Sequence, residues 1–199
     1  DLEIAVYRAT EMEFPEAADA CDGYVITGSK YSVYDDLPWI PALADFVGQA
    51  MKADVRVVGI CFGHQLLAHF FGGSTQPADV GWCVGVQDTQ VVEKRSWMQP
   101  AVERLGLLSS HKDQVSQLPE GAAVFARSTA CPYAGFTLGD RVLTLQGHPE
   151  FAKPYSAALM GHREAILGPE TYAGGITSLD QDVHSDVVGQ WLVNFFRGR

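Results

Sequence analysis

Residues 55–60 read Val-Arg-Val-Val-Gly-Ile, a nearly uninterrupted apolar run that leads directly into Cys61. A strand needs that composition when both of its faces are covered, because neither row of side chains then meets water. Residues 62–71 continue with helical spacing and end at Gly72, where glycine readily supplies the left-handed conformation that closes a helix. This unit predicts a central strand and a following helix, in a sheet that carries helices on both faces.

The rest of the chain alternates strand and helix patterns, which is typical of the α/β class. We expect a central, mostly parallel sheet flanked by helices in a three-layer, flavodoxin-like arrangement, with a small antiparallel section. Gly139 and Asp140 predict a tight hairpin turn in that section. Strands are expected at residues 2–7, 24–27, 82–86, 89–93, 122–126, 133–138 and 141–146, and around Val115. Helices are expected at residues 38–53, 97–105, 154–166 and 181–196, and a loop rich in Gly, Pro, Thr and Ser at 168–179.

Size and charge restrict the class of protein. The length fits one domain over residues 1–199, and 47% hydrophobic residues suffice for a large core. The net charge of -10 disfavours nucleic-acid binding, which needs basic clusters. No apolar run approaches the roughly 20 residues that span a bilayer, and the first residues lack the basic and apolar regions of a signal peptide. We therefore expect a cytoplasmic protein that acts on small molecules or proteins, with no membrane or nucleic-acid partner.

The Gly-Ile-Cys-Phe-Gly segment at residues 59–63 places a cysteine at the junction of the buried strand and the helix. This has the form of a nucleophile elbow, in which a tight strand-to-helix turn lifts the nucleophile above the sheet. A helix N-terminus stabilises a thiolate, and the N–H of Phe62 would point toward an oxyanion formed at the attacked carbonyl. The turn at Gly28 offers a second donor. On this motif alone, a small buried hydrophobe remains the alternative interpretation of Cys61.

Two histidines have an acidic residue two positions later: His111 with Asp113, and His148 with Glu150. Either imidazole is a candidate base for a thiolate mechanism, with the acid fixing its tautomer. His148 follows an apolar run, so it should emerge at the end of a strand, where parallel α/β folds keep their sites. The residues alone leave both pairs open.

The four cysteines form no Cys-x-x-Cys pair, and a core of this size does not need disulfide bonds. We expect free thiols. Cysteine and histidine do not cluster at the spacing of metal ligands, so we expect no metal. The four are Cys21, Cys61, Cys83 and Cys131.

Three segments together resemble class I glutamine amidotransferase domains, in the order found in that family. They are Gly-Ile-Cys-Phe-Gly-His-Gln at 59–65, Ser-His-Lys-Asp at 110–113 and Gln-Gly-His-Pro-Glu at 146–150. The resemblance runs from about residue 4 to about residue 151. It is closest to the amidotransferase domain of GMP synthase and to stand-alone γ-glutamyl peptidases. That family fold begins with a strand and helix not found before Asp1, so we expect either that an N-terminal βα unit is missing or that the edge of the sheet differs.

The resemblance implies a role for each matched residue. Cys61 is implied as nucleophile, His148 as base and Glu150 as orienting acid, which settles the choice between the two histidines. Gly28 is implied as an oxyanion-loop glycine, although family members often carry two adjacent glycines where this chain has Thr-Gly-Ser. The positions implied to hold the amino-acid end of glutamine are Gln65, Ser110, His111 and Asp113.

The implied activity is hydrolysis of a γ-glutamyl amide through a cysteinyl thioester, without a cofactor. If ammonia leaves, a separate synthetase subunit is needed, since this chain carries no Gly-rich phosphate loop. If an amino acid or peptide leaves, the protein is a γ-glutamyl peptidase acting alone on glutathione-like compounds. From other classes, a non-catalytic regulatory module would need none of the three catalytic residues, and a redox sensor or chaperone would not need Glu150.

Overall fold

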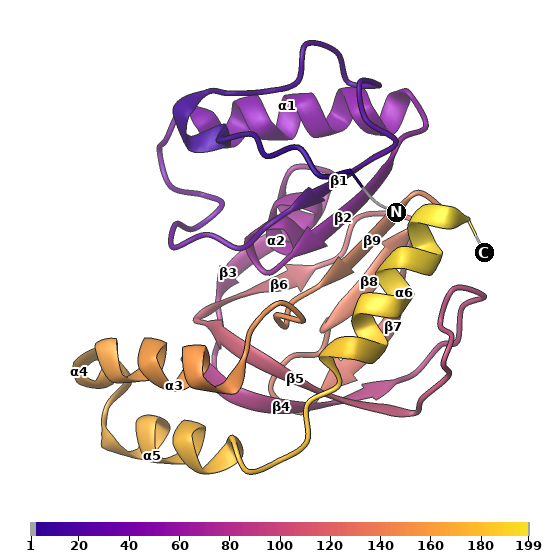
Figure 1. Cartoon of the computed structure of the whole chain (residues 1–199). Coiled ribbons are helices and arrows are strands. Elements are labelled where there is room, and N and C mark those ends of the chain that lie inside the picture. Colours follow the sequence, from indigo (N-terminus) through magenta and orange to yellow (C-terminus); the bar gives the residue numbers. More distant parts are fainter. Residues whose placement is uncertain (1–2, 199) are drawn as a thin grey trace.

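A computed structural model describes residues 3–198 of the chain and has a seven-stranded sheet at its centre (Figure 1). The strand order is β1-β2-β9-β8-β7-β4-β5, and β3 pairs with β6 in a separate two-stranded sheet. The strands are β1 (Gly23–Ile26), β2 (Arg56–Ile60), β3 (Ser74–Pro77), β4 (Cys83–Val91), β5 (Arg104–His111), β6 (Asp113–Gln117), β7 (Ala122–Ser128), β8 (Gly135–Leu138) and β9 (Val142–Leu145).

The helices cover both faces of the large sheet, which confirms the α/β class and the three layers. On one face, α1 and α2 bury Val47 and Leu66 together with Val57 of β2. On the other face, α6 buries Trp191 and Phe195 in a second cluster with the opposite side of β2 and β9. The helices are η1 (Ala9–Glu11), α1 (Trp39–Lys52), α2 (Phe62–His69), α3 (Lys153–His162), α4 (Glu164–Leu167), α5 (Pro169–Ser178) and α6 (Ser185–Arg197).

The strand directions bring the carboxyl ends of β2, β9 and β5 to the same end of the sheet. β1, β2 and β9 are mutually parallel, and the four pairings from β9 through β8, β7 and β4 to β5 are antiparallel. Four reversals leave β5 running in the same direction as β9. The antiparallel section is therefore larger than the sequence indicates, and the predicted hairpin between β8 and β9 is confirmed.

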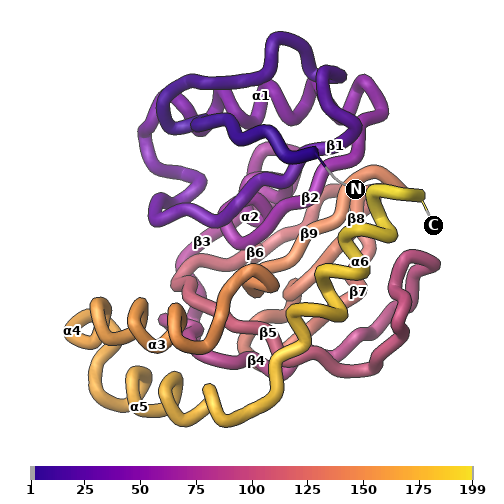
Figure 2. The backbone as a smooth tube through the Cα atoms, viewed as in Figure 1, coloured from indigo at the N-terminus to yellow at the C-terminus, as the bar shows by residue number. Residues whose placement is uncertain are grey.

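The strand predicted at residues 2–7 is wrong for the described part, and Leu2 lies outside it. Residues 3–7 have no strand partner, and Ile4 and Val6 are largely exposed. Instead of joining the sheet, the segment that follows packs along α1 (Figure 2), where the ring of Phe14 stacks on Phe46 with centroids 5.7 Å apart. The apolar residues of this part of the chain thus cover a helix and do not form a strand.

The helix predicted at residues 97–105 is also wrong. Pro100 disfavours a helical conformation at the residue before it. Trp97 is held by packing, with its ring edge-on to Phe125 and Trp191 at 5.5 and 5.9 Å. β5 then begins at Arg104.

The predicted loop at residues 168–179 is a helix, α5. Proline suits the first turn of a helix, and Gly168 provides a positive φ of 75° at its start. A Cβ on Gly175 would lie 2.7 Å from Val84, so this glycine allows α5 to pack closely against β4. The close packing outweighs the low helix propensity of glycine.

Two smaller expectations need correction, and the strand β3 was not predicted. The two strands predicted at residues 82–86 and 89–93 are one strand, β4, because its backbone pairing with β5 continues through Gln87 and Asp88. The helix predicted at 154–166 is divided into α3 and α4 at Arg163. The short polar strand β3 gave no apolar pattern to detect.

Candidate active site

Cys61 stands at the strand-to-helix turn between β2 and α2 in a strained conformation. Its φ is 51°, a value that non-glycine residues rarely adopt, and its N–H donates to the carbonyl of Leu145 at 2.8 Å. A Cβ on Gly59 would lie 2.6 Å from the backbone of Gly63, so the two glycines permit the tight crossing of strand and helix. The thiol is 6% exposed and sits at the positive end of α2.

His148 and Glu150 are joined by a hydrogen bond, and the imidazole interacts with the thiol of Cys61. His148 is 4% exposed, and its backbone N–H donates to Leu108 of β5 at 2.7 Å. Its Nδ1 lies 2.6 Å from Oε1 of Glu150, whose side chain is 49% exposed. Burial lowers the pKa of His148, but hydrogen bonds and charge interactions with Cys61 and Glu150 outweigh it and raise that pKa to about 9. The imidazole is thus poised to hold a proton next to the sulfur.

Gly28 and Phe62 lie beside these side chains. A Cβ on Gly28 would be 2.8 Å from Cε1 of His148 and 3.6 Å from Cβ of Cys61, so the loop after β1 fits against both side chains only because it carries glycine. Phe62 is the first residue of α2, and its N–H therefore has no acceptor within the helix.

Gln65, His111 and Asp113 gather next to His148. The amide Nε2 of Gln65 donates to the backbone carbonyl of Asp113 at 2.8 Å and to Oε1 of Gln146 at 3.1 Å. Nδ1 of His111 lies 3.2 Å from the same carbonyl. Burial, and to a smaller extent the charge of His148, lowers the pKa of His111 to about 4. His111 is therefore neutral at physiological pH.

The carboxylate of Asp113 is buried, and one of its oxygens accepts a hydrogen bond from the hydroxyl of Ser32. The other, Oδ1, has no hydrogen-bond partner within the described residues. Ser110, the last of the matched positions, is half-buried, and its hydroxyl accepts a hydrogen bond from Arg163 at 2.7 Å.

His64 is a residue whose place sequence reasoning missed. It is fully buried on α2 and its Nδ1 lies 2.8 Å from the hydroxyl of Thr144 on β9. The Thr144 hydroxyl donates to the carbonyl of Phe136 at 3.0 Å, so it accepts from an Nδ1–H of His64. Burial lowers the pKa of His64 to about 3. This neutral histidine joins the helix that begins at Cys61 to the strand that leads to His148, and nothing in the sequence pairs residues 64 and 144.

The other cysteines are free thiols, as predicted. Burial raises the pKa of Cys83 and raises that of Cys131 to about 12, so neither is a thiolate at neutral pH. Within residues 3–198, no group of three His, Cys, Asp or Glu side chains is arranged to hold a metal ion. No helix in the same range is long and apolar enough to cross a membrane.

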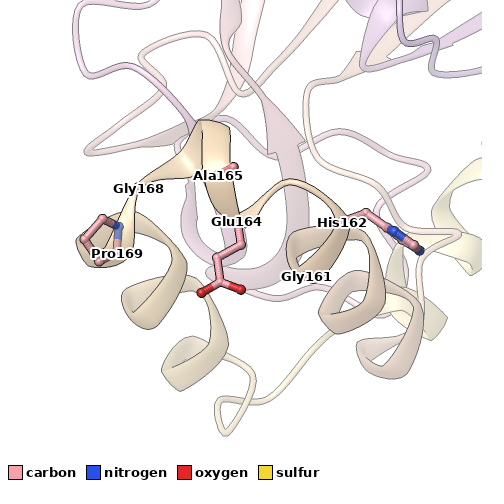
Figure 3. Close-up of a pocket in the computed structure, with 6 residues that line it drawn as sticks. All are labelled: Gly161, His162, Glu164, Ala165, Gly168 and Pro169. Atoms are coloured by element: carbon pink, nitrogen blue, oxygen red, sulfur yellow. The ribbon is translucent and has the colours of Figure 1, made fainter.

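A shallow pocket of about 500 Å³ lies elsewhere, at the junction of α3, α4 and α5 (Figure 3). Glycine, alanine and proline backbone forms much of its wall, and it includes none of the residues around Cys61. The lining residues are Gly161, His162, Glu164, Ala165, Gly168 and Pro169.

Residues 1–160 match the family model described as glutamine amidotransferase class-I. The chain belongs to this family. Class-I glutamine amidotransferases are hydrolytic enzymes that act on γ-glutamyl amides, and the sequence segments that resembled them are the ones gathered around Cys61.

Relatives of two kinds match this class-I amidotransferase chain. Over 152 residues it is 33% identical to γ-glutamyl peptidase 4 of Arabidopsis thaliana, covering 73% of this chain and 61% of that protein. Over 130 residues it is 35% identical to the glutamine-hydrolysing GMP synthase of Thermomicrobium roseum, covering 65% of this chain and 23% of the synthase. The chain thus spans about three fifths of the length of the γ-glutamyl peptidases.

The amidotransferase fold is also found in solved structures. A glutamine amidotransferase from Methylobacillus flagellatus superposes with a TM-score of 0.78 at 22% identity, covering 97% of this chain and 82% of that one. At this identity the likeness establishes the fold.

Proposed function

We propose that this protein hydrolyses the γ-glutamyl amide bond of glutamine or a related compound, with Cys61 as nucleophile, His148 as acid and base, and Glu150 as orienting group. The observation that carries the proposal is that His148 is hydrogen-bonded to Glu150 while interaction with Cys61 helps to raise its pKa. The thiol lies at the N-terminus of α2, and Glu150 holds Nδ1 of His148, which leaves Nε2 for the sulfur.

In the first half of the reaction, the thiolate of Cys61 attacks the δ-carbonyl carbon of the substrate and a C–S bond forms. The carbonyl oxygen becomes an oxyanion, which the N–H groups of Phe62 and Gly28 stabilise. Such donors typically contribute about 3 kcal/mol each. The C–N bond then breaks as His148 gives its proton to the departing nitrogen, leaving a γ-glutamyl thioester on Cys61.

In the second half, water attacks the thioester. His148, now neutral, takes a proton from the water, and the C–S bond breaks to release glutamate and the thiolate. No atom in either half requires a cofactor.

His148 is preferred to His111 as the base because of their surroundings. Interactions with Cys61 and Glu150 raise the pKa of His148 to about 9, which suits an imidazolium beside a thiolate. Burial lowers the pKa of His111 to about 4, and its Nδ1 faces a backbone carbonyl. His111 is better suited to contact substrate as a neutral ring.

The departing group distinguishes two forms of this function. As a glutaminase subunit, the protein supplies ammonia to a separate synthetase; as a γ-glutamyl peptidase, it releases an amino acid or peptide and acts alone. Both forms suit a cytoplasmic protein. The two kinds of relatives support one form each.

Glutamate release by the purified protein tests this proposal. We expect turnover of at least one substrate among glutamine, glutathione and γ-glutamyl dipeptides. Preference for dipeptides favours the peptidase form. Activity on glutamine that rises when a synthetase co-purifies with the protein favours the amidotransferase form. Absence of glutamate release from every substrate would contradict both.

The pH dependence of kcat/KM tests the role of Glu150. His148 holds its proton below the pKa of about 9 and gives it up above that value, so kcat/KM should fall above about pH 9. Glu150→Gln removes one of the charges that raises this pKa. Since the carboxylate is half exposed, we expect the alkaline limb to move toward neutral pH by about one pH unit. Glu150→Asp, which keeps the charge, should move it less, and an unmoved limb in Glu150→Gln would contradict this role.

A further inference from the structure

Arg163 reaches the candidate site from the C-terminal helices. It lies between α3 and α4, and its Nη1 donates to the hydroxyl of Ser110 at 2.7 Å. The guanidinium also lies over the ring of Trp82, 5.3 Å from the centroid. These two contacts fix the side chain in a half-buried position and use one of its five N–H donors.

The guanidinium has no acidic partner. Among residues 3–198, no carboxylate oxygen lies within 4.0 Å of Arg163, whereas Arg104 and Arg141 are paired with Asp88 and Asp54. A fixed guanidinium is a bidentate site for a carboxylate. In a chain of net charge -10, a half-buried arginine with no carboxylate oxygen within 4.0 Å among residues 3–198 points to an anionic group supplied from outside.

Ser110 lies close to His148 along β5. It is the penultimate residue of β5, which ends at the same edge of the sheet as β9, and Leu108 two residues earlier pairs with His148. Two residues of strand span about 7 Å. In an extended glutamine, the α-carboxylate carbon lies about 5 Å from the δ-carbon, four bonds away. Ser110, and with it the guanidinium that it binds, thus lies about two strand residues from the pairing with His148, a separation comparable to the length of a glutamine side chain.

We propose that Arg163 binds the α-carboxylate of the γ-glutamyl group and selects substrates that carry it. This inference rests on the proposed hydrolysis and names its substrate class, L-γ-glutamyl compounds with a free α-carboxylate. Arg163 lies beyond residues 1–160, the part matched by the family model. Recognition of the substrate thus comes partly from helices outside the matched segment.

The test compares L-glutamine with L-glutamine α-amide, which has the same γ-amide and lacks the α-carboxylate. Arg163→Gln should lower kcat/KM for glutamine by about 30-fold or more, and change that for the α-amide by no more than about twofold. Arg163→Lys keeps the charge and should lose less. The matched control is Arg197→Gln, which changes an exposed arginine in the last turn of α6 and should change neither. The C-terminal end of α6 lies on the opposite side of the molecule from α3 and α4 in Figure 1. An equal loss for both substrates, or no loss for either, would overturn the assignment.

A binding measurement separates this inference from the hydrolysis itself. L-glutamate should protect Cys61 of the wild type against alkylation by iodoacetamide, and Arg163→Gln should lose that protection while being alkylated at the unprotected wild-type rate. If no γ-glutamyl amide is hydrolysed but this protection depends on Arg163, the proposed function fails and the carboxylate site stands. If hydrolysis occurs and protection is the same in both proteins, only the carboxylate site fails.

Discussion

Cys61→Ser should reduce glutamate release by about four orders of magnitude or more, without loss of the folded structure. The hydroxyl occupies nearly the same volume, so packing at the turn is retained. It does not ionise at neutral pH, however, and the mechanism starts from an anion at the N-terminus of α2. Steady-state assays together with thermal unfolding of both proteins measure the two effects.

Cys83→Ser and Cys131→Ser are the matched controls for this substitution. Both thiols are buried and have raised pKa values, so neither is a nucleophile at neutral pH. These variants should keep activity within about threefold of wild type per folded molecule, whatever they lose in stability. Cys61→Ser with more than a tenth of wild-type activity would refute the assignment of the nucleophile.

His148→Gln should have the second largest effect, a loss of about three orders of magnitude in kcat. Glutamine retains a polar side chain of similar length but neither carries a proton to the departing nitrogen nor stabilises the thiolate. His111→Gln should cost much less, about tenfold, since the neutral His111 is proposed to contact substrate without moving a proton.

Iodoacetamide alkylation adds a readout that does not depend on turnover. In His148→Gln, alkylation of Cys61 at neutral pH should slow, because the cation that holds the thiolate is gone. In His111→Gln it should remain at the wild-type rate. If instead His111→Gln abolishes hydrolysis and slows alkylation while His148→Gln does neither, the base has been misassigned.

The local chemistry around Cys61 could be predicted from sequence because each part has its own signal. The apolar strand and the flanking glycines indicated the turn at Cys61, and the two-residue spacing of His148 and Glu150 indicated that the carboxylate can reach the imidazole. Both features depend on neighbours in the chain. Gly28 was predicted on the same kind of turn signal, and the structure places it against Cys61 and His148.

The rest depended on contacts between distant residues, which composition does not encode. The choice between His111 and His148 was open from the residues alone, because it depends on which of two similarly buried imidazoles interacts with the thiol and a carboxylate. α5 was hidden by its glycines, of which Gly175 is needed for packing against Val84. The contact of Arg163 with Ser110 joins residues 53 positions apart, and no pattern pairs them.

The central claim is that a thioester forms on the sulfur at the start of α2, and rapid-quench mass spectrometry of the intact protein tests it most directly. After milliseconds of mixing with a turned-over substrate and acid quenching, we expect a fraction of the protein to gain the mass of one γ-glutamyl group. Peptide mapping should place this group on Cys61, and it should be absent from Cys61→Ser. Turnover with no adduct on Cys61, or an adduct on another residue, would contradict the account.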